Sequence, residues 1–391
     1  MSGHSFQIAD LALQRSRYKH LSDDEWRWFL QQVEGKERTA DKLPSFAAIE
    51  NWWYPVRLSC EQCSSEITAK YKASLLTANS SSHSAFADLT GGYGVDTFFL
   101  SGHFTHTDYV EQDAELCRIA AHNFSLQPSD IAVHNTTAET FLATAGQYDL
   151  IFADPYRRDS HGGKVFRLAD CTPDLVQLLP AIMEHLNPDG LILLKLSPML
   201  DISQALKELS VVRDPASLVR WNVHVVAVKN EVKEVLFIGT KGQDTGNPET
   251  ITAIDLAEPE NAFVFIRDEE HEAVCRMVSR TSSHPTFLYE PNAAVLKSGA
   301  YKLVAQRFGL QKLDVNTHLY VSDTLVEHFP GRVWKIIHDS SPLSQANIIC
   351  RNYPLTPEQL KKKMRVRDGG NTYLIACRVA QKTTVFVAER V

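Results

Sequence analysis

The sequence has no run of about 18 apolar residues, the length that an α-helix needs to span a membrane. Residues 1–10 lack the basic segment followed by an apolar stretch that marks a secretory signal. We therefore expect a cytoplasmic protein with no membrane partner. The chain has 391 residues, of which 44% are hydrophobic, and this is enough for two or three domains with their own cores.

Paired cysteine motifs and several catalytic signatures are also missing. Seven cysteines are scattered along the chain, and Cys60 and Cys63 form a C-x-x-C motif without a second pair. A structural zinc site uses four ligands, so we predict no metal site, and disulfides are not expected in a reducing compartment. The sequence contains no H-E-x-x-H, P-loop or G-x-S-x-G motif, which argues against the enzyme classes built on them.

The chain lacks a strong overall charge, but its charge is unevenly distributed. The net charge is −7. Residues 80–250 carry 12 basic and 22 acidic residues, whereas residues 351–391 carry nine basic and three acidic ones. A basic carboxy-terminal region can bind a polyanion. The alternative is that its basic run, Lys361 to Lys363, is only a solvated helix face.

The sequence does contain apolar runs that end in acidic residues. One run leads into Asp88-Leu89-Thr90-Gly91-Gly92-Tyr93-Gly94, the next ends at Glu111, and a third ends at Asp154. In open α/β sheets, ligands bind at the carboxyl ends of the strands, where these residues are expected to lie. Acids at successive strand tips around a glycine-rich turn predict a nucleoside cofactor site.

We predict a role for each of these positions. Gly92 and Gly94 let the backbone approach a ligand closely. Asp88 would accept hydrogen bonds from the ammonium group of a bound amino acid, and Glu111 would accept them from the hydroxyls of a ribose. Ala138, after a further apolar segment, would flank an adenine ring. The predicted cofactor-binding residues are Asp88, Thr90, Gly92, Gly94, Glu111, Ala138 and Asp154.

The glycine spacing by itself is compatible with a dehydrogenase or with a structural turn. It departs from the dinucleotide fingerprint because the third small residue is Thr97. A dinucleotide also presents a pyrophosphate dianion to this loop, whereas the acid at Asp88 suits a cation better. Together with the acidic tip at Asp154, this favours S-adenosylmethionine as the cofactor and a methyl transfer as the reaction.

The tip Asp154-Pro155-Tyr156-Arg157 is similar to the Asp/Asn-Pro-Pro-aromatic tip of amino-methyltransferases. An exocyclic amine is a poor nucleophile because its lone pair is delocalised into the ring. A carboxylate and a backbone carbonyl that accept its N–H groups orient the lone pair toward the methyl group. We predict this role for Asp154, with a stiff turn at Pro155 and base stacking by Tyr156.

The tip departs from that pattern because its aromatic residue is third and is followed by two arginines. Arg157 and Arg158 suit a phosphate-bearing substrate because each offers a planar fork of donors. Pairing with nearby acids such as Asp159 or Asp170 is the alternative. Lys195, at a later strand tip, would face the substrate or form an ion pair. The predicted catalytic residues are Asp154, Pro155, Tyr156 and Arg157.

Residues 80–240 alternate strand and helix patterns, which predicts an α/β fold with a doubly wound, mainly parallel sheet. An antiparallel pair over 223–239 would finish that sheet, and Asn187 to Gly190 would form a turn. The expected strands are 85–89, 108–111, 131–134, 148–153, 191–196, 223–228 and 234–239.

Residues 1–79 are expected to form a helical domain, with a capping box that begins at Ser22. In its last helix, Thr68, Lys70 or Lys72 could reach the carboxylate of the cofactor, or the helix only packs. A linker at 241–248 precedes an α+β region with a helix over 293–308. We divide that region into units 250–329 and 330–391.

Taken together, these blocks resemble bacterial class I methyltransferases with carboxy-terminal ferredoxin-like and THUMP-like domains. The resemblance implies a Rossmann-like sheet, S-adenosylmethionine at the predicted cofactor residues, and an active site around 154–158. THUMP domains bind the acceptor region of tRNA in better known enzymes, so it also implies RNA binding by 330–391. The resembling blocks are 61–75, 88–96, 154–159, 164–166, 195–202 and 368–374.

The sequence thus predicts an RNA-modifying methyltransferase that acts on a base, with an exocyclic amine and tRNA preferred. A small-molecule or protein methyltransferase is an alternative, because the acidic region 80–250 would repel a phosphate backbone. A non-catalytic RNA-binding protein that keeps the sheet as a scaffold is another, because Thr90 and Tyr156 depart from the usual patterns.

Overall fold

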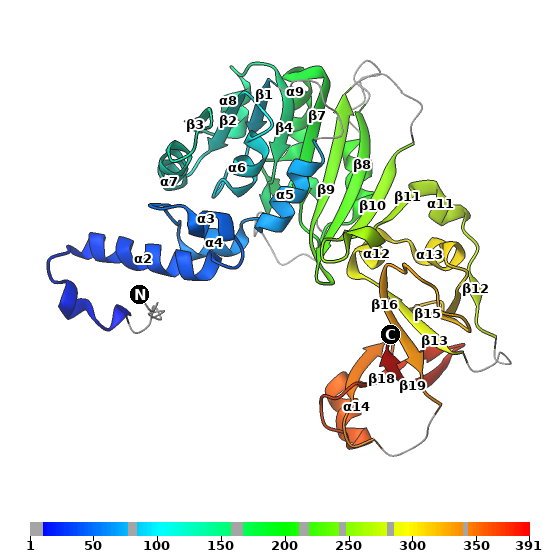
Figure 1. The fold of residues 1–391 in the computed structure, drawn as a ribbon. Helices are drawn as coiled ribbons and strands as arrows, with labels where there is room; N and C mark the ends of the chain where they lie inside the picture. The colour runs from blue at the N-terminus through cyan, green and yellow to red at the C-terminus, as the bar shows by residue number, and fades with distance from the viewer. Residues whose placement is uncertain are drawn as a thin grey trace. The chain divides into compact units, whose positions relative to one another are not determined.

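The computed structural model describes residues 11–76, 84–157, 167–210, 219–241, 248–279, 285–338 and 343–391 (Figure 1). The chain divides into two compact units. The first comprises residues 1–220 and 237–245, and the second comprises residues 221–236 and 246–391. None of the helices in these described ranges is both long and apolar enough to cross a membrane.

The first unit begins with the expected helices. The capping box forms: the Ser22 backbone N–H donates to the Glu25 carboxylate at 2.7 Å, and the Glu25 N–H donates to the Ser22 hydroxyl at 3.3 Å. This reciprocal pair satisfies backbone groups that the first turn of a helix leaves free. The helices of this region are η1 (Arg15–Tyr18), α2 (Asp23–Thr39), α3 (Pro44–Ala48), α4 (Arg57–Gln62) and α5 (Glu66–Ser74).

A parallel sheet forms the rest of the first unit. Strand β1 (Ala85–Asp88) pairs with β2 (His106–Glu111) on one side and with β4 (Tyr148–Ala153) on the other. From there the order continues to β3 (Ile131–Asn135) in one direction and to β7 (Leu186–Leu196) in the other. The order therefore reverses at β1 and β4, and their carboxyl ends border the crevice where such sheets bind ligands. The doubly wound sheet is confirmed.

Helices and short strands connect these sheet strands. Helix α7 begins beside Asp113, whose carboxylate accepts the backbone N–H groups of Glu115 and Leu116 at 2.8 and 3.1 Å. The connecting elements are α6 (Val95–Ser101), α7 (Ala114–Ser125), α8 (Ala138–Leu142), β5 (Tyr156–Arg157), η3 (Leu168–Asp170), β6 (Cys171–Thr172), α9 (Leu175–Glu184) and α10 (Ile202–Leu209).

The turn predicted at residues 187–190 is wrong. These residues lie within β7, where Tyr148 pairs with Leu186 and Leu150 pairs with Leu191. One residue of β4 therefore stands against four residues of β7, which is a bulge rather than a chain reversal. Within this bulge, the Asn187 side-chain amide donates a hydrogen bond to the Asp149 carboxylate at 2.6 Å, so both polar side chains have a partner.

The amino-terminal helices and the sheet share one core. Leu43, Phe46 and Trp52 pack with Tyr93 of the glycine-rich loop, and with Ile119 of α7. The Trp52 indole N–H donates to the Tyr93 hydroxyl at 2.9 Å. Because this cluster joins residues on both sides of the expected boundary at 79, the helices hold the glycine-rich loop in place.

Strands β8 (Val219–Val228) and β9 (Glu231–Lys241) are joined by only two residues, Lys229 and Asn230. Both have positive φ angles, 51° and 63°, and Asp255 accepts their backbone N–H groups at 2.9 and 2.5 Å. A two-residue connection requires an antiparallel hairpin, as expected.

The large sheet does not end at residue 240. Strand β10 (Thr250–Asp255) pairs with β8 in parallel, and β11 (Phe263–Ile266) pairs with β10 antiparallel. The nine strands run in the order β11-β10-β8-β9-β7-β4-β1-β2-β3. The start of the segment expected over 250–329 therefore belongs to this sheet.

A second sheet of eight strands, in the order β12-β14-β15-β13-β16-β19-β18-β17, forms the rest of the second unit. Its core contains Leu288 and Leu319 together with Trp334 and Ile375. Its strands are β12 (Arg276–Met277), β13 (Phe287–Pro291), β14 (Gln311–Asp314), β15 (Thr317–Ser322), β16 (Gly331–Ile336), β17 (Asn347–Arg351), β18 (Thr372–Val379) and β19 (Lys382–Arg390).

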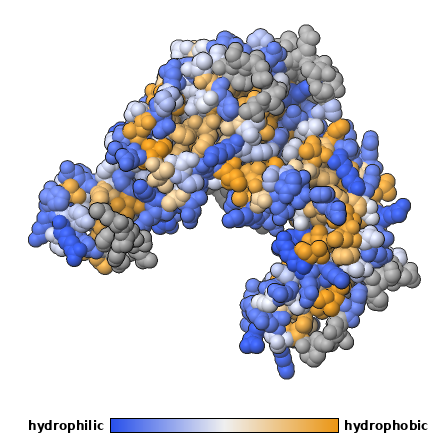
Figure 2. Space-filling view, in the orientation of Figure 1, coloured by the Kyte–Doolittle hydropathy of each residue, from blue (hydrophilic) through white to orange (hydrophobic). Residues whose placement is uncertain are grey.

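The single helix predicted over 293–308 is instead two helices, α12 (Ala293–Ser298) and α13 (Tyr301–Arg307). Gly299 separates them with a φ of +84°, the left-handed conformation that ends a helix. The remaining helices of this unit are η5 (Pro259–Asn261), α11 (Arg267–Glu272) and α14 (Pro357–Met364). Hydrophilic residues cover most of the visible surface of α14 (Figure 2).

Candidate active site

The loop between β1 and α6 is shaped by three glycines. Gly92 and Gly94 have φ angles of +56° and +80°, which favour glycine. A Cβ atom at Gly91 would lie 2.1 Å from the Tyr109 ring, and one at Gly94 would lie 2.8 Å from the Phe124 ring. The loop is therefore pressed against β2 and α7, and side chains at these two positions do not fit.

Asp88 lies beneath this loop and is only 1% exposed. Its carboxylate accepts the backbone N–H of Thr90 at 3.0 Å and the hydroxyl of Thr97 at 2.6 Å. Burial raises the pKa of Asp88 to about 7, although these two hydrogen bonds act in the opposite direction. The carboxylate ties the start of the loop to α6, and its predicted bond to a ligand ammonium stays a prediction.

Glu111 ends β2 beside the loop and is half-buried. One carboxylate oxygen accepts the backbone N–H of Gly92 at 2.9 Å, and the other accepts that of Asp113 at 2.8 Å. These bonds fix the orientation of the carboxylate. Each carboxylate oxygen can accept more than one hydrogen bond, so Glu111 can still accept from the hydroxyls of a ligand.

Asp154 follows β4 and is connected to the glycine-rich loop. Its backbone N–H donates to the Thr90 hydroxyl at 2.6 Å. Its carboxylate accepts a hydrogen bond from the Lys195 ammonium group, and its side chain is 36% exposed. The ion pair considered for Lys195 is confirmed. Lys195 also lines the cavity described below, and its orientation toward a substrate stays a prediction.

The residues after Asp154 form a short antiparallel pair. Tyr156 pairs with Thr172, is 57% exposed, and its hydroxyl accepts the Gln112 side-chain amide at 3.4 Å. The backbone of Arg157 pairs with Cys171. The side chain of Arg157, and all of residues 158–166, lie outside the described residues, so their predicted contacts stay predictions. Cys171 is half-buried.

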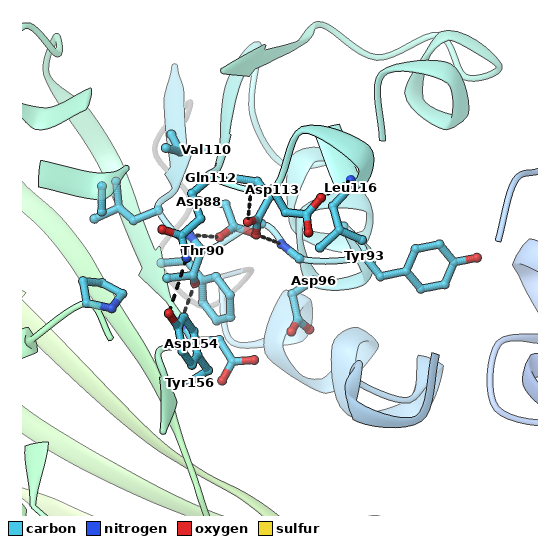
Figure 3. A pocket seen from close by; sticks show the side chains of 18 of the residues that line it. Asp88, Thr90, Tyr93, Asp96, Val110, Gln112, Asp113, Leu116, Asp154 and Tyr156 are labelled. Atoms are coloured by element: carbon cyan, nitrogen blue, oxygen red, sulfur yellow. Dashed lines mark hydrogen bonds between the residues drawn. The ribbon is translucent and has the colours of Figure 1, made fainter. Parts of the chain in front are cut away.

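Most of the predicted site residues line one cavity of about 360 Å³ (Figure 3). Among the described side chains, that of Pro155 is not part of its lining. The Tyr93 side chain points away from it, toward the amino-terminal helices (Figure 3). The predicted residues that line it are Asp88, Thr90, Gly92, Gly94, Glu111, Ala138, Asp154 and Tyr156.

The cavity also has a wall that the sequence did not predict. Ser59, Gln62, Cys63 and Ser64, from α4 and the segment after it, line the cavity together with Asp96 of α6. Ser65 signals the start of α5 because its hydroxyl caps that helix. No local pattern indicates that the preceding segment covers a cofactor loop, since that depends on packing between distant parts of the chain.

Charged side chains behind this wall form a buried group. Lys72 is fully buried, and its ammonium lies 3.2 Å from the Asp96 carboxylate. The Ser64 hydroxyl donates to Asp96 at 2.6 Å, and Lys195 lies 3.7 Å from Asp96. Lys70 instead pairs with Glu66 at 2.5 Å. Neither lysine of α5 is among the residues that line the cavity.

The Cys60–Cys63 motif lies in the same region, with Cys60 buried and Cys63 half-buried. Burial raises the pKa of the Cys60 thiol to about 12 and also raises that of Cys63. The Cys60 thiol donates to the Pro55 carbonyl at 3.5 Å, and the Cys63 thiol to the Cys60 carbonyl at 3.2 Å. Within the ranges that the structure describes, no group of three or more His, Cys, Asp or Glu side chains could hold a metal ion.

The sheet topology and the glycine-rich loop define a Rossmann-like protein of the methyltransferase type. Family models match residues 287–330 as a ferredoxin-like domain and residues 331–390 as a THUMP-like domain. A crystal structure named "putative methyltransferase from Porphyromonas gingivalis W83" is 31% identical, has a TM-score of 0.80, and is matched over 95% of this chain and 92% of that chain. The chain belongs to this methyltransferase family.

Two further solved structures match less than half of this chain. An rRNA methylase from Streptococcus thermophilus is 13% identical, with a TM-score of 0.34 over 46% of this chain and 99% of that chain. The N-methyltransferase NodS from Bradyrhizobium japonicum WM9 is 14% identical, with a TM-score of 0.33 over 45% and 94%. These similarities are too low to bear on substrate. No curated protein matches the chain.

Proposed function

We propose that the protein transfers the methyl group of S-adenosylmethionine to an exocyclic amine of a base in RNA, with tRNA as the preferred substrate. The observation that carries this proposal is the cavity, which brings Asp154 and Tyr156 together with the glycine-rich loop and Glu111. A ligand held by the loop and Glu111 would therefore lie beside the acceptor-binding tip.

The chemistry of the cavity fits this cofactor better than a dinucleotide. Among the described residues that line it, six are acidic and one, Lys195, is basic. A pyrophosphate would be repelled by these carboxylates, whereas S-adenosylmethionine carries a sulfonium and an ammonium against one carboxylate. When bound, the cofactor supplies an electrophilic methyl group. The acidic residues are Asp88, Asp96, Glu111, Asp113, Glu139 and Asp154.

Each predicted residue has a physical task in this proposal. Glu111 would accept the ribose hydroxyls, and Ala138, at the start of α8, would contact the adenine. Asp154 would accept an N–H of the base amine and so direct the nitrogen lone pair toward the methyl group. Tyr156, which is largely exposed at the rim, would stack on the base.

RNA as the substrate is supported by the carboxy-terminal region. Residues 331–390, the THUMP-like match, carry 11 basic and four acidic residues. Lys362 and Lys363 are exposed on α14, whereas Lys361 pairs with Asp368. Exposed cations of this kind bind phosphates through electrostatic attraction.

The test is transfer of tritium from labelled S-adenosylmethionine to total RNA, protein and metabolites from a deletion strain. We expect label in the small RNA fraction, where the modified base can then be mapped. Label only in protein or metabolites would overturn the RNA proposal. Calorimetry with S-adenosylmethionine alone separates cofactor binding from acceptor choice, and absence of binding would favour a non-catalytic protein.

A small-molecule or protein methyltransferase is a second candidate, because the six carboxylates of the cavity would also repel a phosphodiester. The two candidates differ in their response to salt. Binding to RNA weakens steeply with rising salt because counterions are released from the phosphates. Turnover that is insensitive to salt would favour the second candidate.

A further inference from the structure

Four charged side chains form a series that runs from α5 to the proposed active site. Lys72 lies 3.2 Å from Asp96, and Asp96 lies 3.7 Å from Lys195. Lys195 in turn donates a hydrogen bond to the Asp154 carboxylate. The signs alternate along the series, so each interior member has an opposite charge on both sides.

Exposure increases along this series. Lys72 is fully buried, and the side chains of Asp96 and Lys195 are 8% and 12% exposed, whereas that of Asp154 is 36% exposed. Charges in the drier part interact more strongly because water screens them less. A change at Lys72 should therefore act on its neighbours in the series.

Lys195 has two carboxylates within reach, and Asp96 is the more buried of the two. In the intact protein Lys72 neutralises Asp96, and the Ser64 hydroxyl satisfies one of its oxygens. This leaves the Lys195 ammonium directed to Asp154. Without Lys72, the buried Asp96 carboxylate would need Lys195 as its cation.

We propose that Lys195 is a positioning residue that orients the Asp154 carboxylate toward the methyl acceptor, and that Lys72 keeps Lys195 there by neutralising Asp96. This inference rests on the proposed function and deepens it. It makes the amino-terminal helices part of the active-site machinery, because Lys72 belongs to α5 and Asp96 to α6.

The test compares Lys72→Met with the double variant Lys72→Met/Asp96→Asn. The single variant should lower kcat by about 100-fold, because a misplaced acceptor group costs about that much. Adding Asp96→Asn removes the competing charge, so kcat should recover to within about tenfold of wild type. Lysine and methionine are similar in length, and asparagine replaces aspartate without changing its shape.

A second comparison tests Lys195 itself. Lys195→Met should lower kcat by about 100-fold with little change in KM, whereas Lys195→Arg, which keeps a cation, should retain most of kcat. Lys207→Met is the matched control, because Lys207 is exposed on α10 and is not among the lining residues. The substrate for these rate measurements is the cell fraction from the deletion strain, RNA or other, to which the wild-type protein transfers label.

Two readouts besides activity separate the outcomes. Calorimetry with S-adenosylmethionine should give Kd values within about threefold of wild type for all variants, and melting curves report folding. If the double variant is no more active than Lys72→Met, although both are folded, Lys72 has only a structural role. The inference then fails, while the proposed function is unaffected. If the loss appears entirely in cofactor Kd, Lys195 is a cofactor contact instead. A wild-type protein that labels nothing would overturn the proposed function.

Discussion

At the scale of single residues, side-chain hydrogen bonds to neighbouring elements fix the conformation of the glycine-rich loop. Asp88 connects Thr90 to Thr97, and the Thr90 hydroxyl accepts the backbone N–H of Asp154. The departure at Thr90 is therefore a bridge between the loop and the tip at Asp154. A valine in its place would keep the shape and remove this bond.

Gly91 gives the first prediction at this scale. A Cβ there would lie 2.1 Å from the Tyr109 ring, whereas one at Gly92 meets nothing closer than 3.8 Å. Gly91→Ala should therefore destabilise the protein by roughly 2 kcal/mol and weaken S-adenosylmethionine binding. Gly92→Ala should cost about 1 kcal/mol, from its positive φ alone. Urea denaturation and calorimetry check both, and equal effects of the two substitutions would contradict the geometry.

Asp154 gives the second prediction. Asp154→Ala should lower methyl transfer by at least about 100-fold, because the acceptor loses its orienting carboxylate. Cofactor affinity should remain within a few fold, since the backbone N–H of Asp154 still donates to Thr90. Tritium transfer and calorimetry measure the two effects separately. Normal turnover by this variant would exclude the amine-acceptor mechanism.

At the scale of elements, β2 carries a polar cluster at the end away from the cavity. Asp108 accepts hydrogen bonds from His134 of β3 at 2.6 Å and from the Tyr148 hydroxyl of β4 at 2.8 Å. His106 lies 3.2 Å from Asp108 and 2.9 Å from Asp130. These contacts join β2 to β3 and to the start of β4.

This cluster predicts a pH dependence of stability. The pKa of His106 is raised above its ordinary value of 6.5, first by the hydrogen bond with Asp130 and then by the charge of Asp108. A histidine whose pKa is higher in the folded than in the unfolded state stabilises the fold fully at a pH below its unfolded-state pKa. This stabilisation is lost as the pH rises through the folded-state pKa. His106→Gln should therefore lower stability at about pH 6, by at most about 1 kcal/mol because the pair is largely exposed. Urea denaturation should show no difference at about pH 8.5.

At the scale of the whole molecule, the ferredoxin-like and THUMP-like matches are not separable pieces. Strand β16 pairs with both β13 and β19, and Leu288 packs with Trp334 in one core. Glu290 of β13 accepts hydrogen bonds from Arg332 and Arg351 while only 3% exposed. Removing residues 331–391 would therefore expose this core, and a truncation cannot isolate the role of the basic region.

Charge reversal on α14 tests RNA binding without cutting the core. Lys362→Glu/Lys363→Glu should weaken binding of the small RNA fraction and reduce its salt slope by about one to two, because two phosphate contacts are lost. S-adenosylmethionine affinity should not change. Lys207→Glu is the control, because it reverses the charge of a single exposed lysine on α10, outside α14. An unchanged salt slope in the double variant would remove α14 from the RNA-binding surface.

Local patterns were sufficient for seven strands of the large sheet and for most of the cavity, but they did not predict β10 and β11. Alternating apolar runs and turn residues place Asp88, Glu111 and Asp154 at strand ends, and parallel strands bring such ends to one edge of a sheet. The same local reasoning failed at residues 187–190 and at Gly299. A turn-forming sequence can be absorbed as a bulge, and one glycine can end a helix that the apolar pattern continues.

The sequence by itself determined the methyltransferase-type sheet, the glycine-rich loop and the acids at its edge, because these depend on periodicity and turn chemistry within short segments. The tertiary structure decided that Ser59, Gln62, Cys63 and Ser64 form a wall of the cavity. It also decided that Gly91 tolerates no side chain, and that the fully buried Lys72 neutralises Asp96. Each of these depends on contacts between segments far apart in the chain, which no local pattern contains.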